Sequence, residues 1–325
     1  MGINKVQYGN TTLIDLTNDT VTADKLMQGY TAHDRSGALI IGTATQGGSV
    51  TQDQDGFIVL PPDGGGGGGD NTALKGLIEK TITEIDLPND LTKIGQYAFY
   101  KCTGLESITL PNTVTAIDYG AFMSCTSLQS VVFSSGLLTI GSRAFSDCPN
   151  LNITTLPSSV QTIGNYAFMN CSGIIDIYCD GNITNLAISS FLSDSTATPM
   201  NIVEAKFPNL SQTSIGTVFG STTANYACKK LQVADIGEVA SISANAFANC
   251  YKLQTLVLRR TGAVCSLANV SAFLSTPMRG YNSLAGTVYV PSALISTYQT
   301  ATNWSTLYNN GTVTFVAIEG SEYEL

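Results

Sequence analysis

A phrase of about 23 residues recurs along this chain: Ile-Gly, two residues, Ala-Phe, two residues, Cys, two residues, Leu. Its phenylalanines, Phe99, Phe122, Phe145 and Phe168, are each separated by 23 positions. A fixed period of this length indicates a solenoid, in which each coil stacks on its neighbours. Because one coil cannot bury its apolar face alone, we expect the whole array to share one continuous core.

Each position of the phrase has an expected role. The Leu-x-x-Ile-x-Leu part alternates at its end, which predicts a strand whose apolar side chains face the core. The glycine after isoleucine is expected where the backbone turns and a side chain would obstruct it. Beyond residue 180 the phrase loosens, and its phenylalanines follow at spacings of 23, 28, 28 and 26 (Phe191, Phe219, Phe247, Phe273). We expect the extra residues to form loops on one face of the solenoid.

The eight cysteines follow the repeat rather than a disulfide pattern. Five of them occupy the same place in their repeats: Cys102, Cys125, Cys148, Cys171 and Cys250. Equivalent atoms of stacked coils lie about 4.8 Å apart, whereas a disulfide needs about 2.05 Å between sulfurs. We therefore predict a ladder of buried free thiols that act as small hydrophobic side chains. Their spacing does not match a structural zinc site, so no metal is expected.

The net charge and the hydropathy of the chain limit the kinds of partner that it is expected to bind. The net charge is −9 with only 12 % charged residues, which disfavours nucleic acid and anionic lipid surfaces. No stretch reaches the roughly 18 apolar residues of a membrane span. The first eight residues lack the apolar run of a secretory signal.

Composition changes divide the chain into four predicted parts. Residues 1–62 lack the repeat, and short strands are expected at 6–16, 38–43 and 57–60, with a helical turn capped by Thr22. Residues 63–72 form a glycine-rich linker of roughly 13 Å; Asp-Asn-Thr follows the six glycines, which does not fit a phosphate-binding loop. The solenoid is predicted over 73–285. A C-terminal cap is predicted over 286–325, with strands at 287–290 and 312–317 and a helix beginning near Pro291.

The full phrase, Ile-Gly-x-x-Ala-Phe-x-x-Cys-x-x-Leu-x-x-Ile-x-Leu-Pro, resembles the BspA-like leucine-rich repeats of host-associated bacteria and their phages. The resemblance implies an α/β leucine-rich-repeat solenoid with β-rich coils of about 23 residues. It also implies an adhesin or interaction surface rather than an enzyme, without a cofactor. Asp118 in place of the turn glycine and the insertions after residue 180 depart from the family pattern.

Two shorter stretches resemble tail and baseplate proteins from phages of gut Firmicutes. They are residues 25–34 with Gly42-Thr43, and residues 288–291 with Tyr298 and 301–305. This resemblance implies a virion tail protein that binds a host-surface glycan or protein. Residues 1–62 would then contact other tail or baseplate subunits, and a homotrimer is expected to raise avidity. The alternative is a BspA-like adhesin on the bacterial cell surface.

The sequence contains few residues that fit a catalytic site. His33 is the only histidine, and a triad would need a nucleophile beside it. The carboxylates are scattered rather than paired as in glycosidases, and Asp15, Asp19, Asp24 and Asp34 lack the spacing of a calcium loop. An enzyme on a repeat scaffold is therefore the weakest of the three hypotheses.

Two surfaces are candidates for binding. Outward positions of the strands would form a small-polar stripe on the concave side, although the same residues would also suit an ordinary solvated strand. These positions are Glu106, Ser107, Thr109, Gln129, Ser130, Val132, Asn152, Thr155, Asp176, Tyr178, Gln254, Thr255 and Val257. A second stripe, Tyr97, Tyr119 and Tyr166, precedes the Ala-Phe pair and could either stack on sugars or cover the coil edge.

Overall fold

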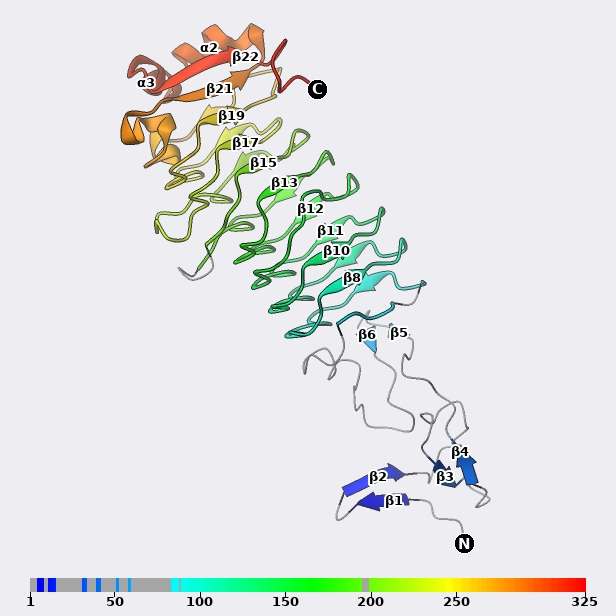
Figure 1. Ribbon diagram of the computed structural model, residues 1–325. Helices are drawn as coiled ribbons and strands as arrows, with labels where there is room; N and C mark the ends of the chain where they lie inside the picture. Colours follow the sequence, from blue (N-terminus) through cyan, green and yellow to red (C-terminus); the bar gives the residue numbers. More distant parts are fainter. Residues whose placement is uncertain are drawn as a thin grey trace.

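The computed structural model describes residues 83–87, 89–194 and 199–325, together with six short strands nearer the N-terminus (Figure 1). Those six strands form three antiparallel pairs: β1 (Lys5–Tyr8) with β2 (Thr11–Asp15), β3 (Thr31–His33) with β4 (Leu39–Ile41), and β5 (Thr51–Gln52) with β6 (Ile58–Val59). The strands expected at 6–16, 38–43 and 57–60 are thus confirmed. The expected turn at Thr22 and the glycine-rich linker lie outside the described residues.

One side of the repeat array is a ladder of parallel strands, which we name the strand face. Equivalent residues pair from coil to coil, as Ser130 does with Ser107 and Thr255 with Val233. The strands are β8 (Ser107–Thr109), β10 (Ser130–Val132), β13 (Asp176–Tyr178), β15 (Glu204–Lys206), β17 (Val233–Asp235), β19 (Thr255–Val257), β21 (Gly286–Val290) and β22 (Val313–Ala317). A bridge between Thr155 and Tyr178 marks the coil that separates β10 from β13. The predicted leucine-rich-repeat solenoid is confirmed.

A second parallel ladder, which we did not predict, forms another side of each coil. Its strands are β7 (Lys93–Ile94), β9 (Ala116–Ile117), β11 (Thr139–Ile140), β12 (Thr162–Ile163), β14 (Asn185–Leu186), β16 (Ser214–Ile215), β18 (Ser241–Ile242) and β20 (Ser266–Leu267). The glycine after the isoleucine of this strand has the expected steric role. A Cβ on Gly164 would lie 2.4 Å from the Ser142 backbone nitrogen of the preceding coil, so the close approach of two coils excludes a side chain.

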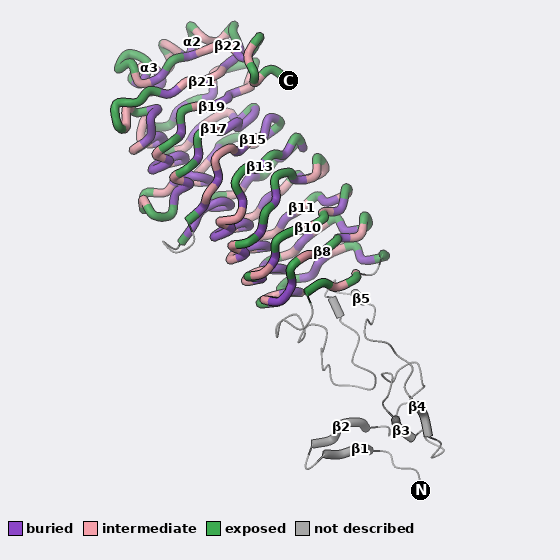
Figure 2. The backbone as a smooth tube through the Cα atoms, viewed as in Figure 1, coloured by how far each residue is buried: buried purple, intermediate pink, exposed green. Residues whose placement is uncertain are grey.

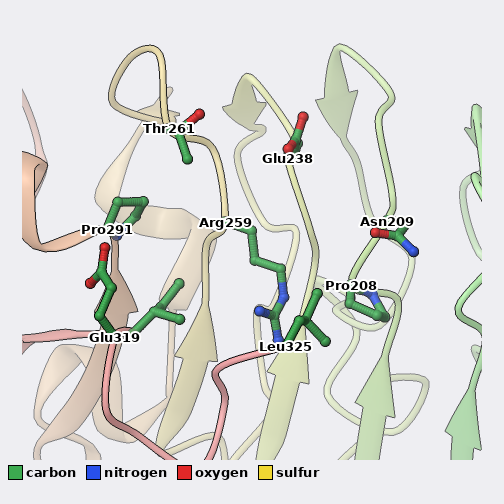
Figure 3. Close-up of a pocket in the computed structure, with 9 residues that line it drawn as sticks. Pro208, Asn209, Glu238, Arg259, Thr261, Pro291, Glu319 and Leu325 are labelled. Carbon is green, nitrogen blue, oxygen red and sulfur yellow. The ribbon is translucent and has the colours of Figure 1, made fainter.

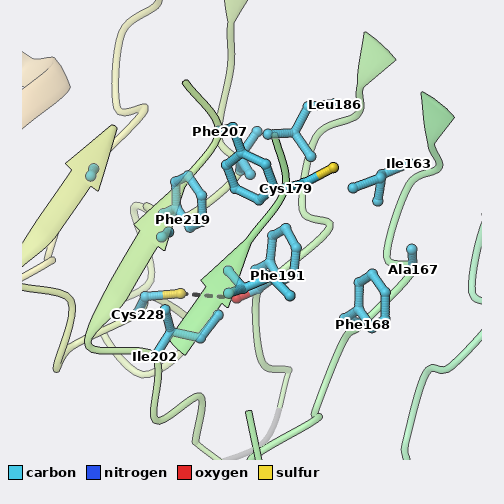
Figure 4. Close-up of a cluster of buried hydrophobic side chains, with 14 of the residues drawn as sticks. Ile163, Ala167, Phe168, Cys179, Leu186, Phe191, Ile202, Phe207, Phe219 and Cys228 are labelled. Atoms are coloured by element: carbon cyan, nitrogen blue, oxygen red, sulfur yellow. Dashed lines mark hydrogen bonds between the residues drawn. The ribbon is translucent and has the colours of Figure 1, made fainter. Parts of the chain in front are cut away.

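The core is a single stack of phenylalanine rings running through the coils. Eight fully buried rings follow one another with centroids 5.1–6.0 Å apart and planes within 11° of parallel. Figure 4 shows Phe168, Phe191 and Phe219 of this stack. They are Phe99, Phe122, Phe145, Phe168, Phe191, Phe219, Phe247 and Phe273. The predicted shared core is confirmed, and it continues across the insertions that lengthen the later coils.

The cysteine ladder runs beside the phenylalanines. All eight cysteines are free and buried, as predicted. Five thiols also act as hydrogen-bond donors, because each Sγ lies 2.9–3.5 Å from the carbonyl oxygen of the phenylalanine one coil earlier (Cys125, Cys148, Cys171, Cys228 and Cys250). Cys228 takes the ladder position of the Phe219 coil despite the intervening insertion, and its backbone N–H donates to the Phe219 carbonyl. The thiols therefore satisfy buried backbone acceptors as well as filling space.

The last coil is followed by short helices and the final two strands of the strand face. The helical segments are η2 (Val270–Phe273), η3 (Pro277–Arg279), η4 (Tyr281–Ser283), η5 (Ser292–Leu294), α2 (Ile295–Thr300) and α3 (Trp304–Asn309). The indole nitrogen of Trp304 donates to the Cys265 carbonyl at 2.8 Å, and the Cys265 N–H donates to the Tyr298 hydroxyl at 2.8 Å. Both aromatic side chains are fully buried. The helix expected near Pro291 and the strands at 287–290 and 312–317 are confirmed.

Candidate binding surface

The strand face brings most of the predicted binding residues together. Ten of the thirteen are exposed and two, Ser107 and Thr255, are partly exposed. Parallel register places equivalent side chains in rows, so that Thr109 neighbours Val132 on the next coil and Thr155 pairs with Tyr178. Figure 2 shows the resulting alternation of buried and exposed segments along each coil. The first half of the solenoid thus carries a continuous exposed surface.

Val257 is the exception, and the prediction that it is exposed was wrong. Its side chain is fully buried, yet it is not part of the hydrophobic core cluster. The register places it beside Tyr289, and Tyr323 from the C-terminal end packs on Tyr289 with ring centroids 4.6 Å apart. Val257 therefore points outward as predicted, but a distant part of the chain covers it.

The sequence analysis missed two strands of the same face, β15 and β17. On β15, Glu204 and Lys206 form an ion pair, and on β17, Asp235 forms a buried pair with Arg259, which follows β19. The Arg259 guanidinium makes two hydrogen bonds shorter than 3.0 Å to one Asp235 oxygen (2.9 and 2.6 Å). The signal was present in the sequence, since Phe207-Pro208 ends β15 as Leu110-Pro111 ends β8, but alanines replace the usual inward leucine or isoleucine.

Desolvation and ion pairing oppose one another at Asp235. Burial raises the pKa of its carboxyl group, while hydrogen bonds from Arg259 and the Gly237 N–H lower it. Both side chains of the pair are buried, and Asp235 also accepts from the Gly237 N–H, so we interpret the pair as structural. A buried pair of this kind fixes one arrangement of the strands rather than adding much stability.

Three exposed apolar side chains stand out within the strand face: Val132, Ile175 and Tyr178, with exposed fractions of 58 %, 52 % and 37 %. Ile175 was not among the predicted residues. Val132 lies on β10, Ile175 lies just before β13, and Tyr178 lies on β13. The polar residues Gln129 and Asp176 flank them. Apolar groups gathered on one exposed face and bordered by polar ones are typical of an interaction surface.

The tyrosine stripe is less regular than predicted. Tyr97 and Tyr119 are exposed and contact each other edge to face at 5.3 Å. Tyr119 precedes its Ala-Phe pair by one residue more than Tyr97 does, and Gly120 takes the equivalent place, where a Cβ would lie 2.7 Å from the Tyr97 ring. Tyr166 is only partly exposed, and the Arg143 guanidinium lies 4.8 Å from its ring centroid. An aromatic pair and a separate cation–π contact therefore replace the stripe.

Within residues 83–87, 89–194 and 199–325, no three His, Cys, Asp or Glu side chains converge in a way that could hold a metal ion. In the same part of the chain, no helix has the length and hydropathy needed to cross a bilayer. His33 ends strand β3, and its side chain lies outside the described atoms.

Comparison with known families agrees with the geometry. The profile of the BspA type leucine rich repeat region matches six copies over residues 77–198 and 200–279. The chain therefore belongs to the BspA-type leucine-rich-repeat family. A search of the curated proteins found no matching sequence.

Several solved structures are similar at low sequence identity. A leucine-rich-repeat protein of T. pallidum is 20 % identical with a TM-score of 0.40, covering 66 % of this chain and 81 % of its own. A leucine-rich-repeat protein from Bacteroides ovatus is 16 % identical with a TM-score of 0.31, covering 98 % and 100 %. A leucine-rich cell surface protein from Faecalibacterium prausnitzii is 15 % identical with a TM-score of 0.27, covering 86 % and 89 %.

Proposed function

We propose that this chain is a non-enzymatic recognition protein whose strand face binds a glycan or protein on a cell surface. The observation that carries the proposal is the exposure of three apolar side chains, Val132, Ile175 and Tyr178, on one face of short polar side chains. The apolar groups supply contact area, and the aromatic ring also suits stacking on a sugar. The flanking amides and carboxylates supply hydrogen bonds for orientation.

Membership of the BspA-type family supports a binding role over a catalytic one, since that family is defined by a repeat scaffold. Fold alone does not establish function, so the proposal depends on the surface. We propose that the partner carries no extended phosphate backbone and is not a lipid bilayer, because the net charge of −9 opposes both.

Two settings fit a protein of this kind. In the first, the chain is an adhesin at the bacterial cell surface, which family membership favours. In the second, it is a phage tail component. The resemblance of residues 25–34 with Gly42-Thr43, and of residues 288–291 with Tyr298 and 301–305, to tail and baseplate proteins favours this setting. Residues 1–62 would then contact other tail subunits, with three copies assembling as a homotrimer and the solenoid facing the host.

The recognition surface is tested by binding of the purified full chain to a glycan array and to intact bacteria. We expect Tyr178→Ala and Val132→Ser to reduce binding by roughly ten-fold or more, as for removal of a central contact residue. Leu138→Ala is the matched control, because Leu138 is exposed to a similar extent but lies outside the strand face. Unchanged binding by the two strand-face variants, or an equal loss with the control, would contradict the proposal.

The setting is tested separately by immunogold electron microscopy of producing cells and of the particles they release. Label on the cell envelope with bare particles supports the adhesin setting. Label on particle tails supports the tail setting and predicts that a chain lacking residues 1–62 is absent from the particles.

A further inference from the structure

A short C-terminal segment lies against the second half of the strand face. We name residues 319–325 the strap. It begins directly after β22, where the Ile318 N–H donates to the Val290 carbonyl at 3.0 Å. The chain then leaves the sheet and brings Leu325 beside Pro208 and Arg259, which belong to earlier coils (Figure 3).

The strap has a defined shape of its own. The Ser321 N–H donates to the Ile318 carbonyl at 2.9 Å, and the Glu324 N–H donates to the Ser321 carbonyl at 3.2 Å. The Gly320 N–H donates to a Glu324 carboxylate oxygen at 2.8 Å. These bonds hold the segment in consecutive turns, so little further ordering is needed for it to lie on a surface.

Few contacts fasten the strap to the strands, and they centre on one aromatic ring. Tyr323 packs on Tyr289 with centroids 4.6 Å apart, and Tyr289 pairs in register with Val257 on the neighbouring strand β19, which also contains Thr255. The Glu319 carboxylate accepts from the Ser292 N–H at 2.9 Å. Val257 lies beside Tyr289 in the strand register. It is fully buried although it does not belong to the hydrophobic core cluster.

Val257 and Tyr289, which lie beside the strap, occupy the same positions in their coils as the exposed residues of the first coils do in theirs. The row that contains Val132 and Tyr178 in the first half of the array continues through Lys206 and Asp235 to Val257 and Tyr289. Beside the strap the surface forms a shallow cavity of about 240 Å³, lined by Pro208, Arg259 and Leu325 among others. The same face is thus open over its first coils and occupied over its last ones.

We infer that Thr255, Val257 and Tyr289 form a peptide-binding surface for a short acidic segment that contains a tyrosine, and that the strap occupies this surface in cis. The strap itself identifies the ligand chemistry, since its sequence Glu-Gly-Ser-Glu-Tyr-Glu-Leu combines one aromatic ring with three carboxylates. The inference rests on the proposed function only in taking the strand face as the recognition face.

Tethering explains why the strap would keep the surface closed to competing peptides. A short tether gives an effective concentration in the millimolar range. A segment that is bound in cis for about nine-tenths of the time or more at roughly 1 mM binds in trans with a dissociation constant of about 100 µM or less. A free peptide therefore competes poorly with the intact strap and binds once the strap is released.

The test uses a fluorescently labelled peptide of residues 318–325 and the full chain, read by fluorescence anisotropy up to about 1 mM peptide. Tyr323→Ala removes the ring contact and releases the strap, and Glu319→Ala, which removes the Ser292 contact, is a second releasing variant. We expect the peptide to bind both variants at least ten-fold more tightly than the wild type. A peptide carrying the Tyr323→Ala change is expected not to bind.

Tyr308→Ala is the matched control, since Tyr308 is an exposed tyrosine of α3 whose ring contacts the core residue Phe315 rather than the outward residues of the strand face. The control is expected to behave as the wild type. Equal binding by wild type and releasing variants would show that the strap does not occupy the surface. Folded releasing variants that bind no peptide would show that the surface does not take peptides. Either result leaves the cell-binding test of Tyr178 and Val132 untouched, so the two proposals fail separately.

Discussion

Two residues in each regular coil adopt a left-handed backbone conformation, on either side of the Ala-Phe pair. In the first row, one position before the alanine, φ is 56–63° at Tyr97, Gly120, Arg143, Tyr166, Ser189 and Asn245. In the second row, two positions after the phenylalanine, φ is 57–63° at Lys101, Ser124, Asp147, Asn170, Asn249 and Ser275. This conformation costs roughly 1–2 kcal/mol for most residues but less for asparagine. The turn at the phenylalanine therefore stores strain that varies with the residue present.

Ser124→Asn should relieve part of this strain. Asn170 and Asn249 already occupy the same position in other coils, and the Asn249 side-chain amide donates to the Ser221 carbonyl. We expect the free energy of unfolding to rise by about 0.5–1 kcal/mol, measured by urea denaturation. Ser135→Asn is the control, because Ser135 is exposed and has no positive φ. An equal gain in both variants would mean that the left-handed turn is not the cause.

Residue-level prediction succeeded where one residue type repeats. The phenylalanine and cysteine ladders could be derived from spacing, because stacking forces equivalent side chains into equivalent environments. The left-handed positions could not, since Tyr, Arg, Lys, Ser and Asp all occupy them and no compositional signal remains. Val257 failed for another reason: its local pattern is that of an exposed strand residue, and Tyr323, far along the chain, contributes to its cover.

At the level of elements, most regular coils contain a longer strand, and each contains a two-residue strand and a turn that carries the phenylalanine. The longer strand could be predicted because the Ile-x-Leu end of its pattern has the period of two of a strand. The two-residue strands, such as Thr139–Ile140, are too short to show an alternation, and only pairing with the adjacent coils defines them. The sequence of a single repeat therefore did not predict the strands on the second side of the solenoid.

Removal of one whole coil should preserve the fold. Deleting residues 117–139 joins Ala116 to Ile140, which occupies the place of Ile117 in the ladder. Since repeat stability is approximately a sum of neighbouring terms, we expect cooperative unfolding and a loss of about 1–3 kcal/mol for 23 residues. Thermal unfolding followed by circular dichroism measures the change.

Deleting residues 117–138 instead provides the matched control for register. It leaves one extra residue at the junction, which shifts the following strand by one position and turns its inward side chains outward. We expect this variant to unfold at a much lower temperature or not to fold. Similar melting of the two deletions would contradict the requirement for register.

At the scale of the whole molecule, the strand face is asymmetric although the repeat that builds it is not. The coils bearing Val132 and Tyr178 are open, whereas those bearing Val257 and Tyr289 are covered by the strap. The repeat determines which side chains point outward, and the C-terminal segment determines which of them meet a partner. This division explains why the rows of the candidate surface could be predicted from the sequence but their accessibility could not.

Alkaline pH should destabilise the solenoid as a whole, because the thiols are shared among its coils. Burial raises the pKa of every cysteine, to about 12 for Cys102, Cys148 and Cys265, from an ordinary value of 9.0. Between pH 9 and 12 the unfolded chain loses thiol protons that the folded chain retains, so folding stability is complete below pH 9 and falls as the pH rises. Between these two pKa values, each such thiol lowers the free energy of unfolding by about 1.4 kcal/mol for every unit by which the pH rises.

Three thiols with a pKa of about 12 thus remove about 4 kcal/mol between pH 8 and pH 10, a large part of the stability of an ordinary domain. Urea denaturation at pH 8 and pH 10 in a phosphine reductant measures the loss while keeping the thiols reduced. Cys148→Ala should lower stability at both pH values but reduce the pH-dependent loss by about 1.4 kcal/mol, since one titrating group is gone. A wild-type protein that is equally stable at pH 8 and pH 10 would show that water reaches the thiols without unfolding, which the close packing of the phenylalanine and cysteine ladders does not allow.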